Sequence, residues 1–260
     1  MVHAVPDILA RIVASKRSAP APSASERAAL ERSASSRTGC RDFRAALTNR
    51  RPAVIGEIKR ASPSKGVFTQ DFQPAAIARI YATGGAAALS VLTDSEFFQG
   101  SLADLESARG AVSIPALRKD FTISELDVIE AAARGADAIL LIAAILDGSE
   151  MRRLRELADR YRMAALVEVH DETEIESALD SGAQIIGVNN RNLHTFETSI
   201  ETSLRLAEKV PSEIVKVSES GIRSRADIAR LEDAGFHAFL IGEHLMRSAD
   251  PAASLRELQS

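Results

Sequence analysis

Eight short apolar segments, each followed by a longer amphipathic one, recur along the chain from Ala53 onward. The short segments are rich in β-branched residues and predict strands, whereas the segments between them carry charged faces at helical spacing. Several helical segments begin with Asp or Ser and end at Gly, as helix caps do. The expected strands are 53–59, 87–92, 116–119, 138–142, 164–169, 185–189, 214–218 and 238–241.

This alternation predicts an α/β fold, a (β/α)8 TIM barrel in which eight parallel strands close on themselves inside a ring of helices. A glycine also ends the helical segment before the second, fourth, sixth and eighth expected strands. Glycine is a common C-cap in any such connection, so this weak repeat supports the barrel without proving it. The alternative architecture is a doubly wound open sheet.

The beginning of the chain does not fit the repeat. We expect residues 1–50 to form a helical extension packed on the barrel, and residues 51–260 to form the barrel as a single domain. An Ala/Ser/Pro-rich stretch within the extension predicts a loop and a short polar helix. Near its start, DILARIVASKR predicts an amphipathic helix that caps the barrel, because one face carries Ile8, Leu9, Ile12 and Val13.

Composition and charge exclude several classes of partner. The chain has 260 residues and a net charge of −4, with Lys and Arg spread evenly, which argues against a nucleic-acid partner. No run approaches the ~20 apolar residues of a membrane span, so we expect no membrane partner. A single cysteine, Cys40, and no signal-peptide pattern predict a cytoplasmic location. The five histidines are scattered, and we expect no metal site.

Charged residues end several expected strands. Because side chains alternate between the two faces of a strand, Glu57 and Lys59 share a face with Ile55. If that face points inward, both charges lie at the C-terminal mouth of the barrel, where such enzymes place their chemistry. The same reasoning brings polar groups from four further strands to the mouth: Lys119, Glu168, Asn189, Arg191, Ser218 and Ser220.

Any one of these residues can be explained as a solvated strand end or a surface ion pair, since charged residues are mostly exposed. Polar ends on five strands, all at one mouth, are harder to explain in that way and favour a shared site. Burial and neighbouring charges shift the pKa values of lysines and glutamates, which prepares such residues for acid/base work.

Glycines follow the last two expected strands directly, at Gly221 and Gly242. A glycine lets the backbone approach a ligand, and the amides at the start of a following helix can hold an anion. In barrels this location is the recurrent phosphate site. The short segment GEHLMRS predicts the extra helix that completes it, and Lys59 can reach the same anion from the first strand.

Six segments, in this order, resemble signatures of the indole-3-glycerol-phosphate synthase family: EIKRASPSKG, LRKDF, LVEVHDE, IGVNNRNL, VSESGI and FLIGEHLMR. The resemblance covers essentially the whole chain. It implies a carboxy-lyase of tryptophan biosynthesis that uses no cofactor. The enzyme would close the ring of 1-(2-carboxyphenylamino)-1-deoxyribulose 5-phosphate with loss of carbon dioxide and water. Gly56 and Gln99 stand where Ala and Gly are more usual, away from catalytic positions.

The resemblance also implies roles for individual residues. Lys119 would act as general acid and Glu168 as general base, while Lys59 and Glu57 would assist proton transfer or hold its geometry. Independently of the resemblance, the segment RASPSKGVF is long and carries Gly, Pro and Ser, which predicts a lid that orders over the substrate. The implied catalytic set is Lys119, Glu168, Lys59, Glu57 and Asn189; the substrate-binding set is Arg191, Ser62 and Ser220; the phosphate-binding set is Lys59, Gly221, Gly242 and Glu243.

Two other functions stay open at this point. One is another phosphate-binding barrel enzyme such as phosphoribosylanthranilate isomerase, which needs only an acid/base pair; the larger charged set and the N-terminal helices speak against it. The other is a non-catalytic barrel that serves as a binding module, which a missing catalytic lysine or glutamate would have supported. The expected partner is a phosphorylated small molecule, and the sequence is compatible with a monomer.

Overall fold

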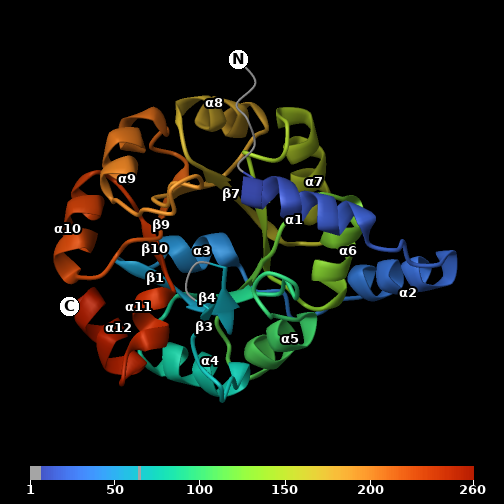
Figure 1. Ribbon diagram of the computed structural model, residues 1–260, viewed down its shortest axis with the longest axis horizontal. Coiled ribbons are helices and arrows are strands. Elements are labelled where there is room, and N and C mark those ends of the chain that lie inside the picture. The colour runs from blue at the N-terminus through green and yellow to red at the C-terminus, as the bar shows by residue number, and fades with distance from the viewer. Residues whose placement is uncertain (1–6, 64–65) are drawn as a thin grey trace.

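The protein is described by a computed structural model that covers residues 7–63 and 66–260. Eight parallel strands form a closed barrel, and β1 pairs with both β4 and β10, which closes the sheet (Figure 1). The barrel prediction is therefore confirmed, and the open sheet is excluded. The strands are β1 Ala53–Ile58, β4 Ala88–Leu92, β5 Ala116–Lys119, β6 Ala138–Ile142, β7 Ala164–Val169, β8 Ile185–Asn189, β9 Val215–Glu219 and β10 Ala238–Ile241.

Helices surround the barrel as an outer ring (Figure 1). Several begin where the sequence predicts a cap: the side chains of Ser101, Ser124 and Asp171 each accept a hydrogen bond from an amide of the first turn. The helices of the ring are α4 Pro74–Thr83, α5 Leu102–Gly110, α6 Glu125–Ala133, α7 Gly148–Arg160, α8 Glu172–Asp180, α9 Glu201–Leu206 with the 3-10 turn Ala207–Lys209, α10 Arg225–Asp233, α11 Glu243–Arg247 and α12 Pro251–Gln259.

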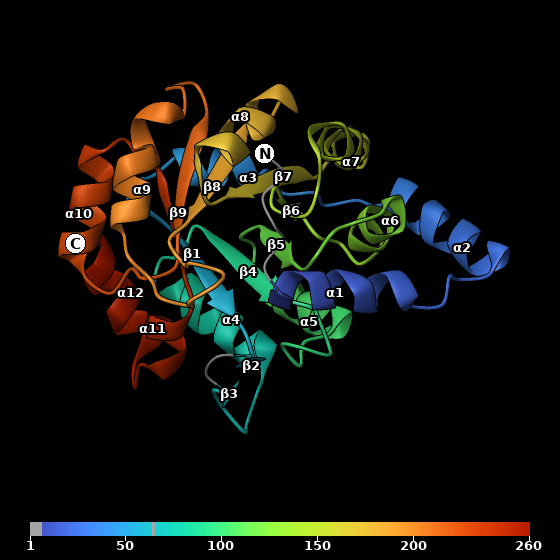
Figure 2. The same cartoon turned by 45° about the horizontal axis from the view of Figure 1, so that its top comes forward.

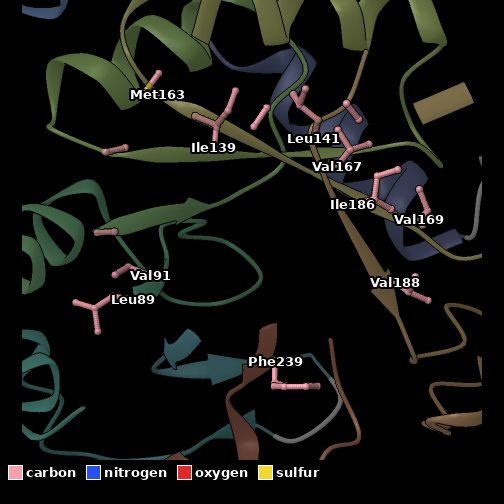
Figure 3. Packing of buried hydrophobic residues seen from close by; sticks show 14 of the residues in the cluster. Leu89, Val91, Ile139, Leu141, Met163, Val167, Val169, Ile186, Val188 and Phe239 are labelled. Atoms are coloured by element: carbon pink, nitrogen blue, oxygen red, sulfur yellow. The ribbon is translucent and has the colours of Figure 1, made fainter. Parts of the chain in front are cut away.

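Strand side chains alternate between two apolar cores. One core fills the barrel interior and includes Ile55, Leu140 and Leu166. The other lies between the sheet and the helices, where Ile139 and Val167 point outward (Figure 3). This alternation is what directs a polar residue at a strand end either into the mouth of the barrel or under a helix.

The departure at Gly56 is explained by its neighbour on α4. A Cβ atom at Gly56 would lie 2.5 Å from Cδ2 of Tyr81, whose ring is fully buried against the outer face of β1. A larger residue at position 56 would need a smaller one at position 81. The two residues therefore form a matched pair in the outer core.

Within residues 7–52, three helices precede the barrel: α1 Asp7–Ser18, α2 Ala24–Ser35 and α3 Phe43–Thr48. Leu9 and Ile12 of α1 join the interior core with Phe121, which follows β5, so α1 covers part of the C-terminal mouth (Figure 2). Phe43 and Leu47 of α3 close the opposite end, and α2 packs on α6. None of the described helices is long and apolar enough to cross a membrane.

The segment expected to act as a lid forms a small antiparallel hairpin of β2 Ala61–Ser62 and β3 Gly66–Val67. Ser64 and Lys65, which lie between β2 and β3 in the sequence, are outside the described residues. The aromatic ring of Phe68, just after β3, lies 5.3 Å from the Lys59 ammonium. The hairpin therefore sits beside the charged end of β1.

Candidate active site

A cavity of about 1000 Å³, part of it open to solvent, occupies the C-terminal mouth of the barrel. Its apolar side is lined by α1 and by strand residues that include Leu140 and Ile142. A second hollow adjoins it at the ends of β9 and β10. The two hollows share five lining residues: Glu57, Lys59, Arg191, Ser220 and Glu243.

Lys119, the last residue of β5, lies between two carboxylates inside the barrel. Its Nζ atom is 2.8 Å from Oε2 of Glu168 on β7 and 3.0 Å from Oε2 of Glu219 on β9. All three side chains are nearly inaccessible, at 13% exposure for Lys119, 6% for Glu168 and 2% for Glu219. Two acids and one base are thus held together away from water, an arrangement typical of proton-transfer sites.

Glu219 is the functional candidate that sequence reasoning missed. We expected Ser218 to face the mouth, and this is wrong: its hydroxyl points under the helices, where it bonds Oγ of Ser203 at 2.8 Å and Asn190 at 2.9 Å. The inward face of β9 carries Val215, Val217 and Glu219. Side-chain alternation defines the two faces of a strand but does not say which face points into the barrel. The glutamate next to Ser218 was the signal that could have identified the inward face of β9.

Ser220 nevertheless reaches the mouth, although strict alternation would place it with Ser218. Its φ of 68° turns the backbone after β9, and the residue lines both hollows. Few residues other than glycine adopt this conformation, and such strain concentrates at functional sites.

The first strand contributes a second ion pair. Nζ of Lys59 lies 2.5 Å from Oε1 of Glu57, and both side chains face the hollows. Ser62, on β2, lines the same cavity. The C-terminal end of β1 therefore directs Glu57 and Lys59 into the mouth of the barrel, as side-chain alternation predicts.

The end of β8 contributes two further polar residues to the site, Asn189 and Arg191. Nδ2 of Asn189 donates to Oε1 of Glu168 at 3.1 Å, and Oδ1 accepts from the amide of Arg191 at 3.0 Å. The guanidinium of Arg191 donates to the carbonyl of Phe196 and lines both hollows. Asn189 thus fixes one oxygen of Glu168, while Lys119 bonds the other.

The buried charges shift one another's pKa values in opposite directions. Burial alone would lower the pKa of Lys119, but the facing carboxylates of Glu168 and Glu219 outweigh it and raise that pKa above its usual range. Burial raises the pKa of Glu219 to about 7, despite the opposing effect of Lys119. For Glu168, burial is outweighed by Lys119 and His170, which lower its pKa to about 2. The lysine is therefore protonated at neutral pH.

Two glycines keep the second hollow open. Gly221 has a φ of 76°, and a Cβ atom there would lie 3.2 Å from Cβ of Thr198. A Cβ atom at Gly242 would lie 2.2 Å from Oε1 of Glu57 and 3.0 Å from Nζ of Lys59. No side chain caps the first turn of α11, which begins at Glu243. The second hollow is thus bordered by the backbone at Gly221 and Gly242, by the ammonium of Lys59 and by the start of α11. Such a space is suited to an anion.

Across residues 7–63 and 66–260, no cluster of three or more His, Cys, Asp or Glu side chains has an arrangement that could hold a metal ion. The arrangement present is one for acid/base chemistry on a ligand that has both an apolar part and an anionic part. Every residue of the three expected site sets lines one or both hollows.

Comparisons with known proteins agree with this geometry. The family model for indole-3-glycerol phosphate synthase matches residues 9–258. Indole-3-glycerol phosphate synthases from Polaromonas naphthalenivorans and Burkholderia vietnamiensis are each 51% identical to this chain, over 97% of it and 98% of their own lengths. A solved 3-hexulose-6-phosphate synthase shares the fold, with a TM-score of 0.63 at 17% identity, over 80% of this chain and 98% of its own. The chain belongs to the indole-3-glycerol phosphate synthase family.

Proposed function

We propose that this protein converts 1-(2-carboxyphenylamino)-1-deoxyribulose 5-phosphate into indole-3-glycerol phosphate, carbon dioxide and water. The observation that carries the proposal is the position of Lys119 Nζ, held between two buried carboxylates at the floor of the cavity. An apolar wall lies on one side of this floor, and a glycine-lined hollow lies on the other. Such a site fits a substrate with an aromatic ring at one end and a phosphate at the other.

The two ends of the substrate match the two hollows. The aromatic ring would pack against Leu9, Ile12 and Leu140, which line the apolar side. The phosphate would bind the backbone at Gly221 and Gly242, with the ammonium of Lys59 as counter-charge. The reacting carbons between them would then lie at Lys119.

Arg191 would bind the carboxylate that the aromatic ring carries. Its guanidinium can present two parallel N–H groups to two carboxylate oxygens, a match that a lysine cannot make. Ser62 and Ser220 would hydrogen-bond the sugar hydroxyls, since both line the first cavity. These contacts would orient the ring carbon toward the carbonyl it must attack.

Ring closure begins when the carboxylate-bearing ring carbon attacks the ketone carbon of the sugar. Lys119 donates a proton to the ketone oxygen, which becomes a hydroxyl, and the carboxylate then leaves as carbon dioxide. Loss of that hydroxyl as water requires a further proton, for which Lys59 or the reprotonated Lys119 is available. Glu168 takes the proton that must leave the new five-membered ring. Glu57 and Asn189 hold these groups in place.

Substrate binding would also adjust the acid and the base. Two of the three N–H donors of Lys119 bond carboxylates, so a ketone oxygen can take the third donor or replace one carboxylate. If it replaces a carboxylate, loss of that partner lowers the raised pKa of the lysine. If the displaced carboxylate is Glu168, its lowered pKa rises and it becomes a stronger base. Glu219 would keep its bond and hold Lys119 in position.

The proposal is tested by a fluorescence time course with the carboxyphenylamino-deoxyribulose phosphate. The chain contains no Trp, so growth of indole emission reports product alone. We expect an increase that scales with protein concentration, together with release of carbon dioxide. Folded protein without either signal would contradict the proposal, and would redirect attention to the isomerase and the binding-module alternatives.

A further inference from the structure

His170, directly after β7, has its ring between two carboxylates. Nδ1 lies 3.0 Å from Oε2 of Glu174 in the first turn of α8, and Nε2 lies 3.5 Å from Oε1 of Glu168. The same Glu174 oxygen accepts the backbone amide of His170 at 2.7 Å, which fixes the ring against α8. The proposed reaction steps involve neither His170 nor Glu174.

The Nε2 atom of His170 is buried and has no hydrogen-bond partner in the described part of the chain. Its nearest carboxylate oxygen, on Glu168, is slightly beyond hydrogen-bonding distance. A buried polar nitrogen without a bond costs free energy unless some state of the protein satisfies it. The geometry therefore suggests a second position of Glu168 in which this bond closes.

A proton on each ring nitrogen of His170 suits the groups that the two nitrogens face. A carboxylate accepts hydrogen bonds and cannot donate one, and a carboxylate faces each nitrogen. A neutral imidazole has one unprotonated nitrogen, and the lone pair of that nitrogen would point at one of the two carboxylates. The arrangement therefore favours the imidazolium form, and the pKa of His170 is raised by Glu174 and Glu168 against the opposing effect of burial.

The charged groups that face His170 are all carboxylates, which stabilise the positively charged imidazolium form. Glu174 faces it from α8, Glu168 from its own strand and Glu219 from β9. Lys119 lies beyond Glu168 and bonds the opposite oxygen, Oε2. Glu168 thus lies between two cationic side chains, and it loses Lys119 if the ketone oxygen of the substrate replaces Glu168 on the lysine.

We propose that His170 is a positioning residue for Glu168: anchored by Glu174, its imidazolium binds Oε1 of Glu168 when Lys119 turns to the substrate. Oε2, released by Lys119, is then free to accept the ring proton, while Oε1 stays bonded to Asn189 and His170. Without His170 the released carboxylate would keep only the amide of Asn189. This inference rests on the proposed role of Glu168 as the base.

The anchoring is tested without any turnover, by nitrogen NMR of the substrate-free protein labelled at the histidine side chains. The His170 signals, assigned by their loss in His170→Asn, should report protons on both ring nitrogens at neutral pH. Glu168→Gln and Glu174→Gln should each lower the midpoint of the His170 titration. A neutral ring at neutral pH, or a midpoint that Glu168→Gln leaves unchanged, would overturn the proposal.

Two replacements separate the two ring nitrogens in kinetic measurements. His170→Asn keeps a donor near the Nδ1 position and loses the one near Nε2, whereas His170→Gln keeps a donor near Nε2. We expect His170→Asn to lower kcat by about tenfold with little change in KM, and His170→Gln to retain most of kcat. In His170→Asn the acid limb of the kcat profile should move to higher pH, because Glu168 loses a neighbouring cation.

The matched control is His194→Gln, a change at an exposed histidine outside the cavity lining, which should leave kcat as it is. Equal losses in His170→Asn and His170→Gln, at unchanged melting temperature, would contradict the role of Nε2. If the wild-type protein makes no product, the proposed function fails, while the NMR measurement still decides whether His170 anchors Glu168.

Discussion

The two ends of the barrel both bury charges, and they treat them differently. At the N-terminal end, Asp137 is 1% exposed, and each of its oxygens accepts two hydrogen bonds: from Arg109 and the Arg41 amide on one side, and from Arg109 and the Ala116 amide on the other. At the mouth, Oε1 of Glu219 and Nε2 of His170 have no hydrogen-bond partner in the described part of the chain. The Asp137 carboxylate is thus fully bonded, although Nε of its neighbour Arg37 is buried without a partner, whereas the Glu219 carboxylate at the mouth keeps one oxygen without a bond.

This difference separates a structural ion cluster from a reactive one. A fully bonded carboxylate has no free lone pair for a substrate, so the Asp137 cluster only joins the N-terminal extension to β6 and α5. At the mouth, Lys119 and Glu168 line an open cavity, where a ligand can exchange bonds with them. Buried charge by itself therefore does not mark an active site; a buried lysine and carboxylate that line a cavity do.

The largest expected effect tests the mouth. Lys119→Met fills the volume of the lysine but removes the proposed acid, and we expect turnover to fall by about 10²–10⁴-fold. The indole-emission assay and circular dichroism together measure activity and fold. The control, Lys209→Met at an exposed position, should leave both unchanged. Turnover within tenfold of the wild type would remove Lys119 as the acid.

The corresponding change at the other end should have the opposite profile. Asp137→Ala leaves Arg37 and Arg109 without their buried partner, and we expect the free energy of unfolding to fall by about 3–5 kcal/mol. Urea denaturation measures this loss, while kcat of the folded fraction should stay unchanged. Glu125→Gln, which breaks an exposed pair with Arg153, is the control and should cost less than about 1 kcal/mol. A large loss of kcat in Asp137→Ala would erase the contrast between the two ends.

A smaller effect is expected at the phosphate cradle. Gly221→Val adds a side chain at a φ of 76° next to Thr198, so KM should rise by about tenfold or more while kcat changes less. Gly39→Val is a matched control, because Gly39 also has a positive φ, 65°, but a Cβ atom there meets nothing within 4 Å. An unchanged KM in Gly221→Val would withdraw the phosphate assignment.

The smallest expected effect concerns stability against pH. The pKa of Glu219 is raised to about 7 in the folded protein from an ordinary value of 4.5, so the wild type loses stability as pH rises through that window. Glu219→Gln cannot ionise and escapes this loss. We expect its melting temperature, relative to the wild type, to rise between pH 5 and pH 8, as calorimetry would measure. A difference that stays constant with pH would mean that Glu219 is already ionised at pH 5.

Features that depend on local pattern were predicted from the sequence. Six of the eight expected strands keep the predicted first residue, and Lys119, Glu168 and Glu57 lie at the mouth as their places near strand ends required. Strand ends, helix caps and side-chain alternation arise from neighbouring residues, so they can be read without knowledge of the rest of the chain. The family motifs are equally local, and they led to the family that the comparisons then established.

The closed barrel decided what local pattern could not. Ser218 and Glu219 are adjacent, and only the packing of β9 between β8 and β10 turns the glutamate inward and the serine toward Ser203. The carboxylates of Glu168 and Glu219 meet on Lys119 from strands far apart in the chain. The hydrogen-bond partners of these charged groups are decided by distances across the barrel. Those distances are set only when the sheet closes.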